Sequence, residues 1–233
     1  MLNERLTKEY LNPDLSVPWM DFRLPEDAME HLRNAKTVLE LGEEDDANSD
    51  LAGNISNSKY IQDKDNWFYD NILKECVEYL YFRESWSNYF ECVVANSRSV
   101  PLFSLRELWV NYQKQHEFNP AHYHMDGGGF SFVVFLKIPT HWKEQHALPI
   151  SANSNSPVAS DFAFLSGTKD LQTQQGMGPV IVKNFPLCPE DEGRILFFPA
   201  WLSHQVYPFY GTEEERITVS GNIAFQEEET KKR

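Results

Sequence analysis

From about residue 102 onward the sequence is a succession of short apolar or alternating segments that are separated by Gly, Pro and Asn breaks. These segments are Leu105–Tyr112, Phe130–Ile138, Asp161–Leu165, Pro179–Phe185, Arg194–Phe198, Gln205–Phe209 and Arg216–Phe225, together with a short one before His122. Runs of this length and spacing are typical of strands, and no helical pattern lies between them. About eight antiparallel strands therefore predict a mainly β chain, arranged as a sandwich or jelly roll.

The first hundred residues have a different pattern. Pro25–Leu41 and Asn66–Tyr89 carry apolar residues at helical spacing, and the acidic, Asn- and Ser-rich stretch Glu43–Asn57 between them is typical of an exposed loop. We expect one domain: a helical and irregular elaboration over 1–100, a catalytic jelly-roll core over 101–226 and a frayed tail over 227–233. The long connection Thr140–Ser160 is expected to be a functional lid or a linker.

Composition limits the partners of this chain. The formal net charge of -14 argues against nucleic acid and against an anionic membrane surface, because both repel an acidic protein. The three cysteines are too few and too widely spaced for a disulfide framework, and no stretch has the length of a membrane span or the apolar core of a signal peptide. We expect a location in the cytoplasm, or in the host cytoplasm if the protein is viral.

The segment His122-Tyr-His124-Met-Asp126 is the first candidate for chemistry, and three glycines follow it. Side chains two positions apart on an extended segment point to the same side, so His122, His124 and Asp126 can converge on one metal ion. The glycines would allow the backbone to turn closely beside such an ion. The alternative is a polar strand end that leads into a Gly-rich turn.

His204 is the second candidate, because it stands just past the buried-looking run that ends at Pro199. Alone it would be a structural histidine. Together with the earlier cluster it becomes the third ligand of a facial triad of two histidines and one carboxylate, which leaves coordination positions open for a co-substrate and oxygen.

The third candidate is the alternating segment Arg216-Ile-Thr218-Val-Ser220-Gly-Asn222. A surface strand would show this polar face to water. However, Arg216 follows His204 by twelve residues and shares its face with Thr218 and Ser220. A guanidinium beside hydroxyls is a suitable receptor for a carboxylate, since it bonds both oxygens in one plane.

In this order the three elements resemble the iron(II)- and 2-oxoglutarate-dependent oxygenases, whose motif is His-x-Asp or His-x-Glu, a distal His, and Arg-x-Ser or Arg-x-Thr on the last strand. The sequences around 119–124, 131–139 and 198–209 resemble more narrowly the prolyl-4-hydroxylase-like members found in marine bacteria and phages. The resemblance covers about residues 100–226. It implies a double-stranded β-helix core on which the N-terminal helices pack.

The resemblance also implies a function. The chain would be a 2-oxoglutarate-dependent dioxygenase with Fe(II), 2-oxoglutarate and O2, which hydroxylates a protein side chain or a small molecule and releases succinate and CO2. His204 would be the distal iron ligand, and Arg216 would bind the far carboxylate of 2-oxoglutarate with help from Thr218 or Ser220. Tyr112 and Asn222 would contribute to the same pocket. The oxidisable substrate stays unidentified, and antiparallel edge strands allow a homodimer.

Two sets of metal ligands are compatible with the motif. One consists of His124, Asp126 and His204; the other consists of His122, His124 and His204, as in the narrower group. We favour the first set, because a carboxylate lowers the net charge of an iron site and suits its oxygen chemistry. In the second set Asp126 would be a loop residue or would support a ligand.

Two other functions fit the same fold. A cupin-like metal enzyme would not use 2-oxoglutarate, so Arg216→Ala would leave its activity intact. A jelly-roll binding or virion module without enzymatic activity would bind its ligand without metal.

Overall fold

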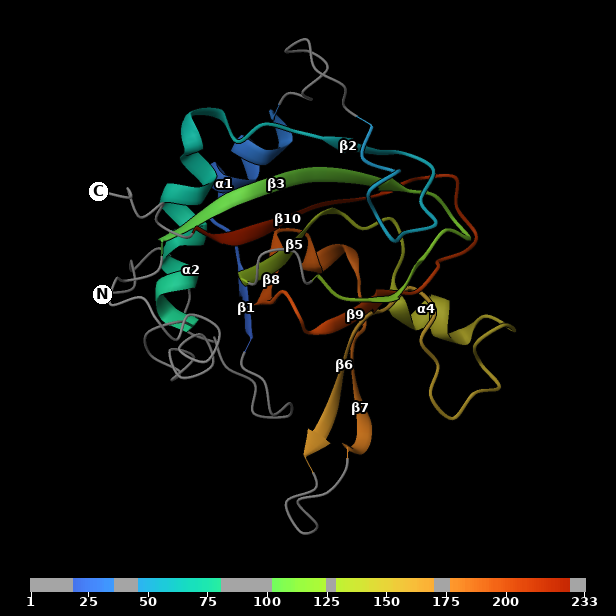
Figure 1. Cartoon of the computed structure of the whole chain (residues 1–233). Helices are drawn as coiled ribbons and strands as arrows, with labels where there is room; N and C mark the ends of the chain where they lie inside the picture. Colours follow the sequence, from blue (N-terminus) through green and yellow to red (C-terminus); the bar gives the residue numbers. More distant parts are fainter. Residues whose placement is uncertain (1–18, 36–45, 81–101, 125–128, 170–176, 227–233) are drawn as a thin grey trace, which may run out of the picture.

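The computed structural model describes residues 19–35, 46–80, 102–124, 129–169 and 177–226. Its strands form two antiparallel sheets (Figure 1). The larger sheet has six strands in the order β1 (Met20–Arg23), β8 (Arg194–Pro199), β5 (Gly129–Lys137), β10 (Arg216–Gln226), β3 (Leu102–Gln113) and β2 (Ser58–Tyr60). The smaller sheet has four strands in the order β4 (Asn119–His122), β9 (Ser203–Val206), β6 (Phe162–Lys169) and β7 (Met177–Phe185).

The chain passes repeatedly from one sheet to the other. β3, β5, β8 and β10 lie in the larger sheet, whereas β4, β6, β7 and β9 lie in the smaller one. This alternation winds the eight strands into a double-stranded β-helix, so the predicted mainly β jelly-roll fold is confirmed. Every predicted strand has a counterpart, although β3 and β6 are longer than expected and β9 covers Ser203–Val206 where Gln205–Phe209 was predicted.

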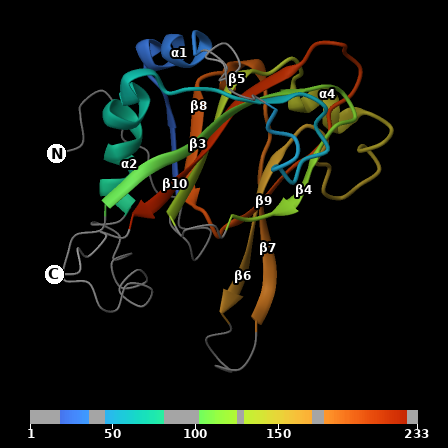
Figure 2. The same cartoon turned by 45° about the horizontal axis from the view of Figure 1, so that its top comes forward.

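The N-terminal part adds two strands and a helical layer. β1 pairs with β8 and β2 pairs with β3, so both extend the larger sheet at its edges. α1 (Glu26–Arg33) and α2 (Lys74–Glu78), the latter preceded by the π-helical turn Tyr69–Leu73, lie on the side of this sheet that faces away from the smaller one (Figures 1 and 2). The rings of Phe68 and Phe132, 5.8 Å apart, join this layer to β5.

A second apolar layer fills the space between the two sheets, where aromatic rings interlock. Phe164 packs edge-on against Phe198 at 4.8 Å and against Phe185 at 5.3 Å, and Phe162 packs against Phe135 at 6.2 Å. These rings are almost completely buried. Rings of this size bury enough apolar surface to hold the sheets face to face, so they fix the position of every inward-facing polar group.

Two connections differ from the sequence-based expectation. Part of the predicted exposed loop Glu43–Asn57 lies against the sandwich, since Asn54 donates its N–H to the Phe118 carbonyl at 2.8 Å. The predicted connection Thr140–Ser160 contains the short helix α4 (Trp142–Ala147), and its residues Thr140, Gln145 and Ser160 are buried. The predicted helix over Pro25–Leu41 is longer than the observed one, because α1 ends at Arg33 and Asn34 caps it. The parts of the two helix predictions that fall on 36–41 and 81–89 lie outside the described residues. Among the described helices, none has the length and apolarity that crossing a membrane requires.

Candidate metal centre and carboxylate pocket

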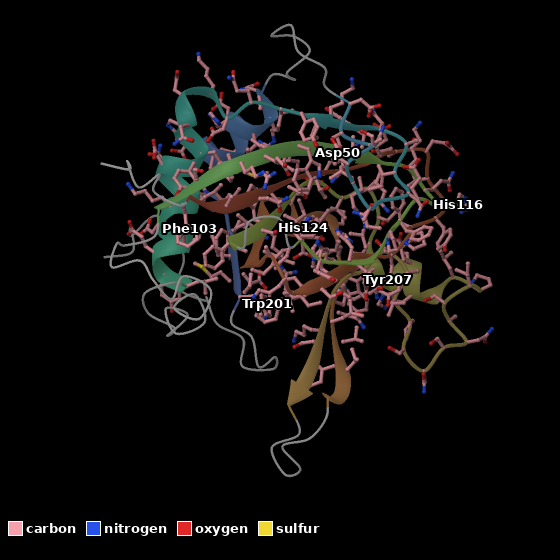
Figure 3. The ribbon with its side chains drawn as sticks, in the orientation of Figure 1. Asp50, Phe103, His116, His124, Trp201 and Tyr207 are labelled. Carbon is pink, nitrogen blue, oxygen red and sulfur yellow. The ribbon has the colours of Figure 1, made fainter. Side chains whose placement is uncertain are left out.

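Three histidines meet where the smaller sheet faces the larger one. β4 and β9 pair so that His122 lies opposite His204. His124, two residues past His122, comes to the same point. Figure 3 labels His124 near the centre of the view. Potential ligand atoms of the three rings lie within 4.8 Å of one another, and the His122 and His204 ring centroids are 4.2 Å apart. The sequence-based cluster thus meets the distal histidine in space.

Backbone hydrogen bonds orient two of these rings. The His122 Nδ1 lies 2.8 Å from the Pro120 carbonyl oxygen, and the His204 Nδ1 lies 3.0 Å from the Leu202 carbonyl oxygen. Since a carbonyl only accepts, each Nδ1 carries the ring proton and each Nε2 keeps a free lone pair. A hydrogen bond of this kind is typical of metal-ligating histidines, in which it fixes the tautomer and the ring orientation.

Burial keeps these imidazoles neutral. It lowers the pKa of His122, and it lowers the pKa of His204 well below the ordinary histidine value, with a further contribution from the adjacent His122. A neutral imidazole is the form that binds a metal. Phe162 stacks on the His204 ring at 6.0 Å and Phe198 meets it edge-on at 4.9 Å, so the ring has little freedom to turn away.

The position of His124 depends on a close approach of two backbone segments. His124 donates its N–H to the Ala200 carbonyl at 2.8 Å, and Ala200 donates its own N–H to the Gly129 carbonyl at 2.9 Å. A Cβ on Gly129 would lie 1.9 Å from the Ile223 carbonyl oxygen, so no other residue fits at this point. The glycine is therefore required for packing beside the site.

Arg216 lines the same cavity from the larger sheet, and it is completely buried. Its Nη2 donates to the Ser160 carbonyl at 2.8 Å and to the Ser160 Oγ at 2.6 Å, and its carbon Cζ lies 5.1 Å from the Phe209 ring centre. Burial lowers the pKa of Arg216 to about 10, against a Coulomb attraction to Asp161 that raises it, and the group stays cationic at pH 7. Its Nε is buried without a hydrogen-bond partner.

An unpaired buried N–H of an arginine costs free energy, about 1–3 kcal/mol or more for a charged group. The Arg216 residue that carries this donor lines the cavity that also holds the three histidines. A carboxylate in this cavity would accept from Nε and neutralise the guanidinium. The residues therefore fit an anionic ligand next to a metal ion.

Uncharged polar side chains complete this wall of the cavity. On β10 Thr218 and Ser220 point inward with Arg216, and on β3 Asn111 and Gln113 do the same. Asn111 receives a hydrogen bond from Ser58 at 2.8 Å and donates to Thr218 at 3.4 Å; the Gln113 Oε1 lies 3.5 Å from Nη1 of Arg216.

Two residues that the resemblance places in the pocket lie elsewhere. Tyr112 points to the opposite face of β3, where it lines a different depression together with Ile217. Alternation along the strand requires this, because its neighbours Asn111 and Gln113 point inward. Asn222 is also outside the cavity lining; its amide accepts from Ser131 at 2.8 Å and donates to Glu107 at 3.3 Å.

The segment over 48–55 forms a further wall that sequence reasoning missed. Asn48, Leu51, Gly53 and Ile55 line the cavity, although their acidic neighbours Asp46 and Asp50 are exposed. A Cβ on Gly53 would lie 1.9 Å from the Asn119 Oδ1, so the segment packs directly on β4. The prediction of an exposed loop is confirmed for the acidic side chains of Asp46 and Asp50. It is wrong for the residues of 48–55 that line the cavity.

Asp126 lies outside the described residues, so the sequence-based choice between the two ligand sets stays a prediction. Within the described ranges, the set that lies together is His122, His124 and His204. At the end of the predicted lid Thr140–Ser160, Ser160 contacts Arg216, and the role of this connection as a lid stays a prediction.

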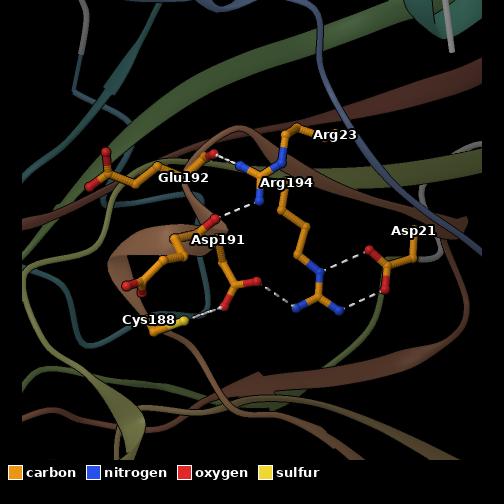
Figure 4. Close-up of polar contacts among 7 residues, drawn as sticks. Asp21, Arg23, Cys188, Asp191, Glu192 and Arg194 are labelled. Atoms are coloured by element: carbon orange, nitrogen blue, oxygen red, sulfur yellow. Dashed lines mark hydrogen bonds and ion pairs between the residues drawn. The ribbon is translucent and has the colours of Figure 1, made fainter. Parts of the chain in front are cut away.

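A second group of potential ligand atoms lies on a surface turn and has other partners. His141, Cys188 and Glu190 come within 4.8 Å of one another. However, the His141 Nδ1 accepts the Lys143 N–H at 3.1 Å, and the Cys188 thiol donates to Asp191 at 3.2 Å (Figure 4). Burial and the carboxylates of Asp191 and Glu190 raise the pKa of Cys188 to about 12, so its thiol stays protonated. His141 and Cys188 thus serve as caps of their local turns.

Comparisons with known proteins agree with this geometry. A family model described as "Putative 2OG-Fe(II) oxygenase" matches residues 107–222, which contain all three histidines and Arg216. No curated protein matches the chain significantly.

Several solved structures are also similar. A Pseudomonas putida prolyl-4-hydroxylase has 14% sequence identity, 91% of this chain and 95% of that chain aligned, and a TM-score of 0.42. The viral collagen prolyl hydroxylase from Paramecium bursaria Chlorella virus-1, in complex with 2OG, has 13% sequence identity and a TM-score of 0.43. The alignment covers 88% of this chain and 94% of that chain. A 2OG-Fe(II) oxygenase family oxidoreductase from Burkholderia pseudomallei has 14% identity over 64% of this chain, a TM-score of 0.34, and only 56% of its own length matched. These likenesses are too distant to bear on the substrate.

Proposed function

This chain belongs to the 2OG-Fe(II) oxygenases, and from that premise we propose that it hydroxylates an aliphatic carbon of its substrate while it converts 2-oxoglutarate to succinate and CO2. One observation carries the proposal: three histidines, two of them oriented by backbone carbonyls, and a buried arginine with an unpaired N–H line one cavity. A metal centre alone would need no such arginine.

We propose that His122, His124 and His204 hold the Fe(II). Imidazole suits iron(II) among the first-row metals, and the Nε2 atoms of His122 and His204 have free lone pairs because their Nδ1 atoms are engaged with carbonyls. This is the second of the two ligand sets that the sequence allows. It leaves the site with the full charge of the ion, which a dianionic co-substrate then offsets.

Arg216 is proposed to bind the far carboxylate of 2-oxoglutarate. Its Nη2 is held by Ser160, which fixes the orientation of the guanidinium, and its Nε is buried without a hydrogen-bond partner. Thr218 and Ser220 lie one and two alternations further along the same face of β10, where their hydroxyls would donate to the same ligand. Because Arg216 is buried, this ion pair would be poorly screened by salt.

The iron and 2-oxoglutarate would supply the oxidising chemistry, and the protein would supply binding, orientation and exclusion of water. Phe162, Phe198 and Val206 surround the histidines with apolar surface. A dry lining of this kind limits side reactions of a reactive centre with solvent.

The substrate is proposed to enter along the wall formed by 48–55 and Trp109. Leu51, Ala52 and Ile55 give this wall an apolar character, and the Trp109 ring centre lies 6.3 Å from that of His124. Apart from Arg216 and the three histidines, the described lining residues include no ionisable side chain. An uncharged aliphatic group, on a protein side chain or on a small molecule, suits this wall best.

Anaerobic titration of the Fe(II)-loaded protein with 2-oxoglutarate tests the proposal. Wild type should develop a weak visible metal-to-ligand charge-transfer band, and Arg216→Gln should weaken 2-oxoglutarate binding at least about 100-fold, as expected for loss of a buried charged partner. In air, Arg216→Gln should likewise release less succinate than wild type. Iron binding without any band at saturating 2-oxoglutarate would favour the cupin-like enzyme instead.

The ligand set is tested separately. If the three histidines bind the ion, His122→Ala should abolish Fe(II) binding, whereas Asp126→Ala should lower the affinity by at most about 10- to 100-fold, the range expected for a residue that only supports a ligand. The opposite result would identify Asp126 as the third ligand. Thermal melting of each metal-free variant controls for loss of the fold.

A homodimer remains a prediction, and we propose that two chains would pair through β7, the edge strand of the smaller sheet. This outer strand of the smaller sheet exposes Val180, Ile181 and Val182, and the β6–β7 hairpin projects from the molecule in Figure 1. Exposed apolar edge strands favour pairing with a second chain. Light scattering should detect a dimer in wild type and a monomer in Val182→Lys.

A further inference from the structure

An acid–base pair lies next to the Arg216 site and has no part in the proposed function. His146, on α4, approaches the Asp161 Oδ1 with its Nε2 at 2.8 Å. The Asp161 side chain is 1% exposed, whereas the His146 side chain is 14% exposed. One member of the pair therefore reaches solvent, and the other is enclosed beside the cavity wall.

The backbone connects this pair directly to Arg216. Asp161 follows Ser160, whose carbonyl and hydroxyl both accept from Arg216. Ser160 has a φ of 74°, a left-handed conformation that a serine rarely adopts. It is held there by its N–H, which bonds to the Pro208 carbonyl at 2.9 Å, and by Thr140, whose hydroxyl lies 3.2 Å from its own. A shift of Asp161 would therefore be transmitted to the guanidinium.

Asp161 is an incompletely compensated buried anion. Its Oδ2 is buried without a hydrogen-bond partner. Burial raises its pKa, and the hydrogen bond and charge of His146 and the charge of Arg216 act in the opposite direction. Tyr207 also faces it, since Asp161 raises the pKa of that phenol by Coulomb repulsion in addition to burial. Trp142 covers the other side of the His146 ring at 5.4 Å.

We propose that His146 is a positioning residue for the co-substrate: through Asp161 it takes up a proton when a carboxylate binds to Arg216. This inference rests on the proposed function, because the carboxylate is that of 2-oxoglutarate. It adds a proton to the binding reaction and gives α4 a part in it.

The charges give the reason. Without ligand, the positive charge of Arg216 offsets the negative charge of Asp161. A bound carboxylate neutralises Arg216, so the attraction that stabilised the Asp161 anion is lost and two buried anions share one cation. Protonation of His146 restores neutrality at the solvent-exposed member of the pair. Binding of 2-oxoglutarate and binding of the proton therefore favour each other.

The sign of the pH dependence follows. Since the complex holds more protons than the free protein, affinity for 2-oxoglutarate falls as the pH rises through the range in which the free pair has lost its proton and the bound pair retains it. For one proton the limit is a tenfold increase in Kd per pH unit. At higher pH, where both states are deprotonated, Kd becomes constant.

Isothermal titration calorimetry of the full chain tests the inference. Mn(II) replaces Fe(II) as a divalent ion that oxygen and nitrogen ligands also hold. Binding of 2-oxoglutarate is measured near pH 7 in two buffers with different ionisation enthalpies, and the difference in heat gives the number of protons exchanged. Wild type should take up protons on binding, and its Kd should rise with pH.

His146→Gln is the decisive variant, because its amide still donates to Asp161 and carries no proton. It should bind 2-oxoglutarate without proton uptake and with a Kd that no longer changes with pH, while Kd at the alkaline end stays near that of wild type. Undiminished proton uptake in His146→Gln would overturn the inference. His141→Gln, one turn earlier on the same segment, is the matched control and should behave like wild type.

The outcomes separate the two proposals. If wild type with Mn(II) does not bind 2-oxoglutarate at all, the proposed function fails. If wild type binds it without proton uptake, the proposed function stands and the role of His146 is wrong. His146→Ala, which removes the donor, should weaken binding at every pH, and His146→Gln should restore the alkaline value; equal weakening in both variants would mean a structural role only.

Discussion

His204 illustrates how single residues combine several constraints. Its ring is stacked on Phe162, its Nδ1 is bonded to the Leu202 carbonyl, and it lies opposite His122 across two paired strands. Each constraint comes from a different segment of the chain. The sequence marks His204 as a residue past a buried strand, but only the folded chain supplies the tautomer and the ring partners.

The paired strands β3 and β10 allow a test of which side chains reach the co-substrate. Thr218→Val should raise the Kd for 2-oxoglutarate about five- to tenfold, since one neutral hydrogen bond contributes about 1 kcal/mol. Tyr112→Phe should leave this Kd unchanged, because Tyr112 faces away from the cavity. The same spectroscopic titration measures both. An effect of Tyr112→Phe comparable to that of Thr218→Val would contradict the placement on the opposite face.

The Tyr112 case also shows a limit of sequence reasoning. The alternating pattern of Leu105–Tyr112 identifies a strand, but it does not fix which set of alternate residues faces the cavity. That choice depends on pairing with β10, where Arg216 lies opposite Gln113 and Thr218 opposite Asn111. Arg216, by contrast, could be recognised because its neighbours on one face are all polar.

At the scale of the elements, the strands were predictable and the connections were not. Gly, Pro and Asn breaks delimit β5, β8 and β10, whose apolar runs identify them as strands. β1 and β2 are short and join the sheet only by pairing at its edges, so their sequences carry no periodic signal. The wall over 48–55 is held by contacts with β4 and has no local signature either.

The turn into β5 provides a prediction at this scale. Gly129→Ala would place a Cβ 1.9 Å from the Ile223 carbonyl, so β5 and β10 must separate locally. We expect a loss of about 2 kcal/mol or more in the free energy of unfolding, together with weaker metal binding, because His124 depends on the adjacent backbone bonds.

Gly211→Ala is the control for this change. Gly211 has a φ of 83°, and a methyl group added to it would have no atom within 4 Å, so its replacement introduces backbone strain alone. It should cost about 1 kcal/mol and leave metal affinity unchanged. Urea denaturation measures both variants. Equal losses of stability at the two positions would mean that the close approach at Gly129 is unimportant.

On the scale of the whole molecule, the site joins the two sheets. The histidines belong to the smaller sheet or its connection, whereas Arg216 belongs to the larger one. A ligand that contacts both the metal ion and Arg216 would link the sheets across the cavity. The overall charge of -14 has no direct part in this, since the cavity itself carries a local cation.

Ligand-induced stabilisation follows from this arrangement. Mn(II) and 2-oxoglutarate, both present near 100 times their Kd, should each add about 2.7 kcal/mol to the stability of the folded state. For a chain of this size this corresponds to a combined rise in Tm of about 10 °C or more. Scanning calorimetry should show that 2-oxoglutarate has little effect without the metal. The same rise in His204→Ala would contradict the proposed site.

The pairing of β4 with β9 has a consequence for how such a chain can change during evolution. His122 and His204 meet because two short strands pair in one particular irregular register, in which Asn119 lies opposite Val206 and His122 opposite His204. A slip of one position would bring the exposed Tyr123 to the place of a histidine. Insertions and deletions between 119 and 124 should therefore abolish activity, while the exposed stretch 152–156 could gain or lose residues freely. During evolution, the number of residues between 119 and 124 should therefore be conserved more strictly than the identity of the residues that are not ligands.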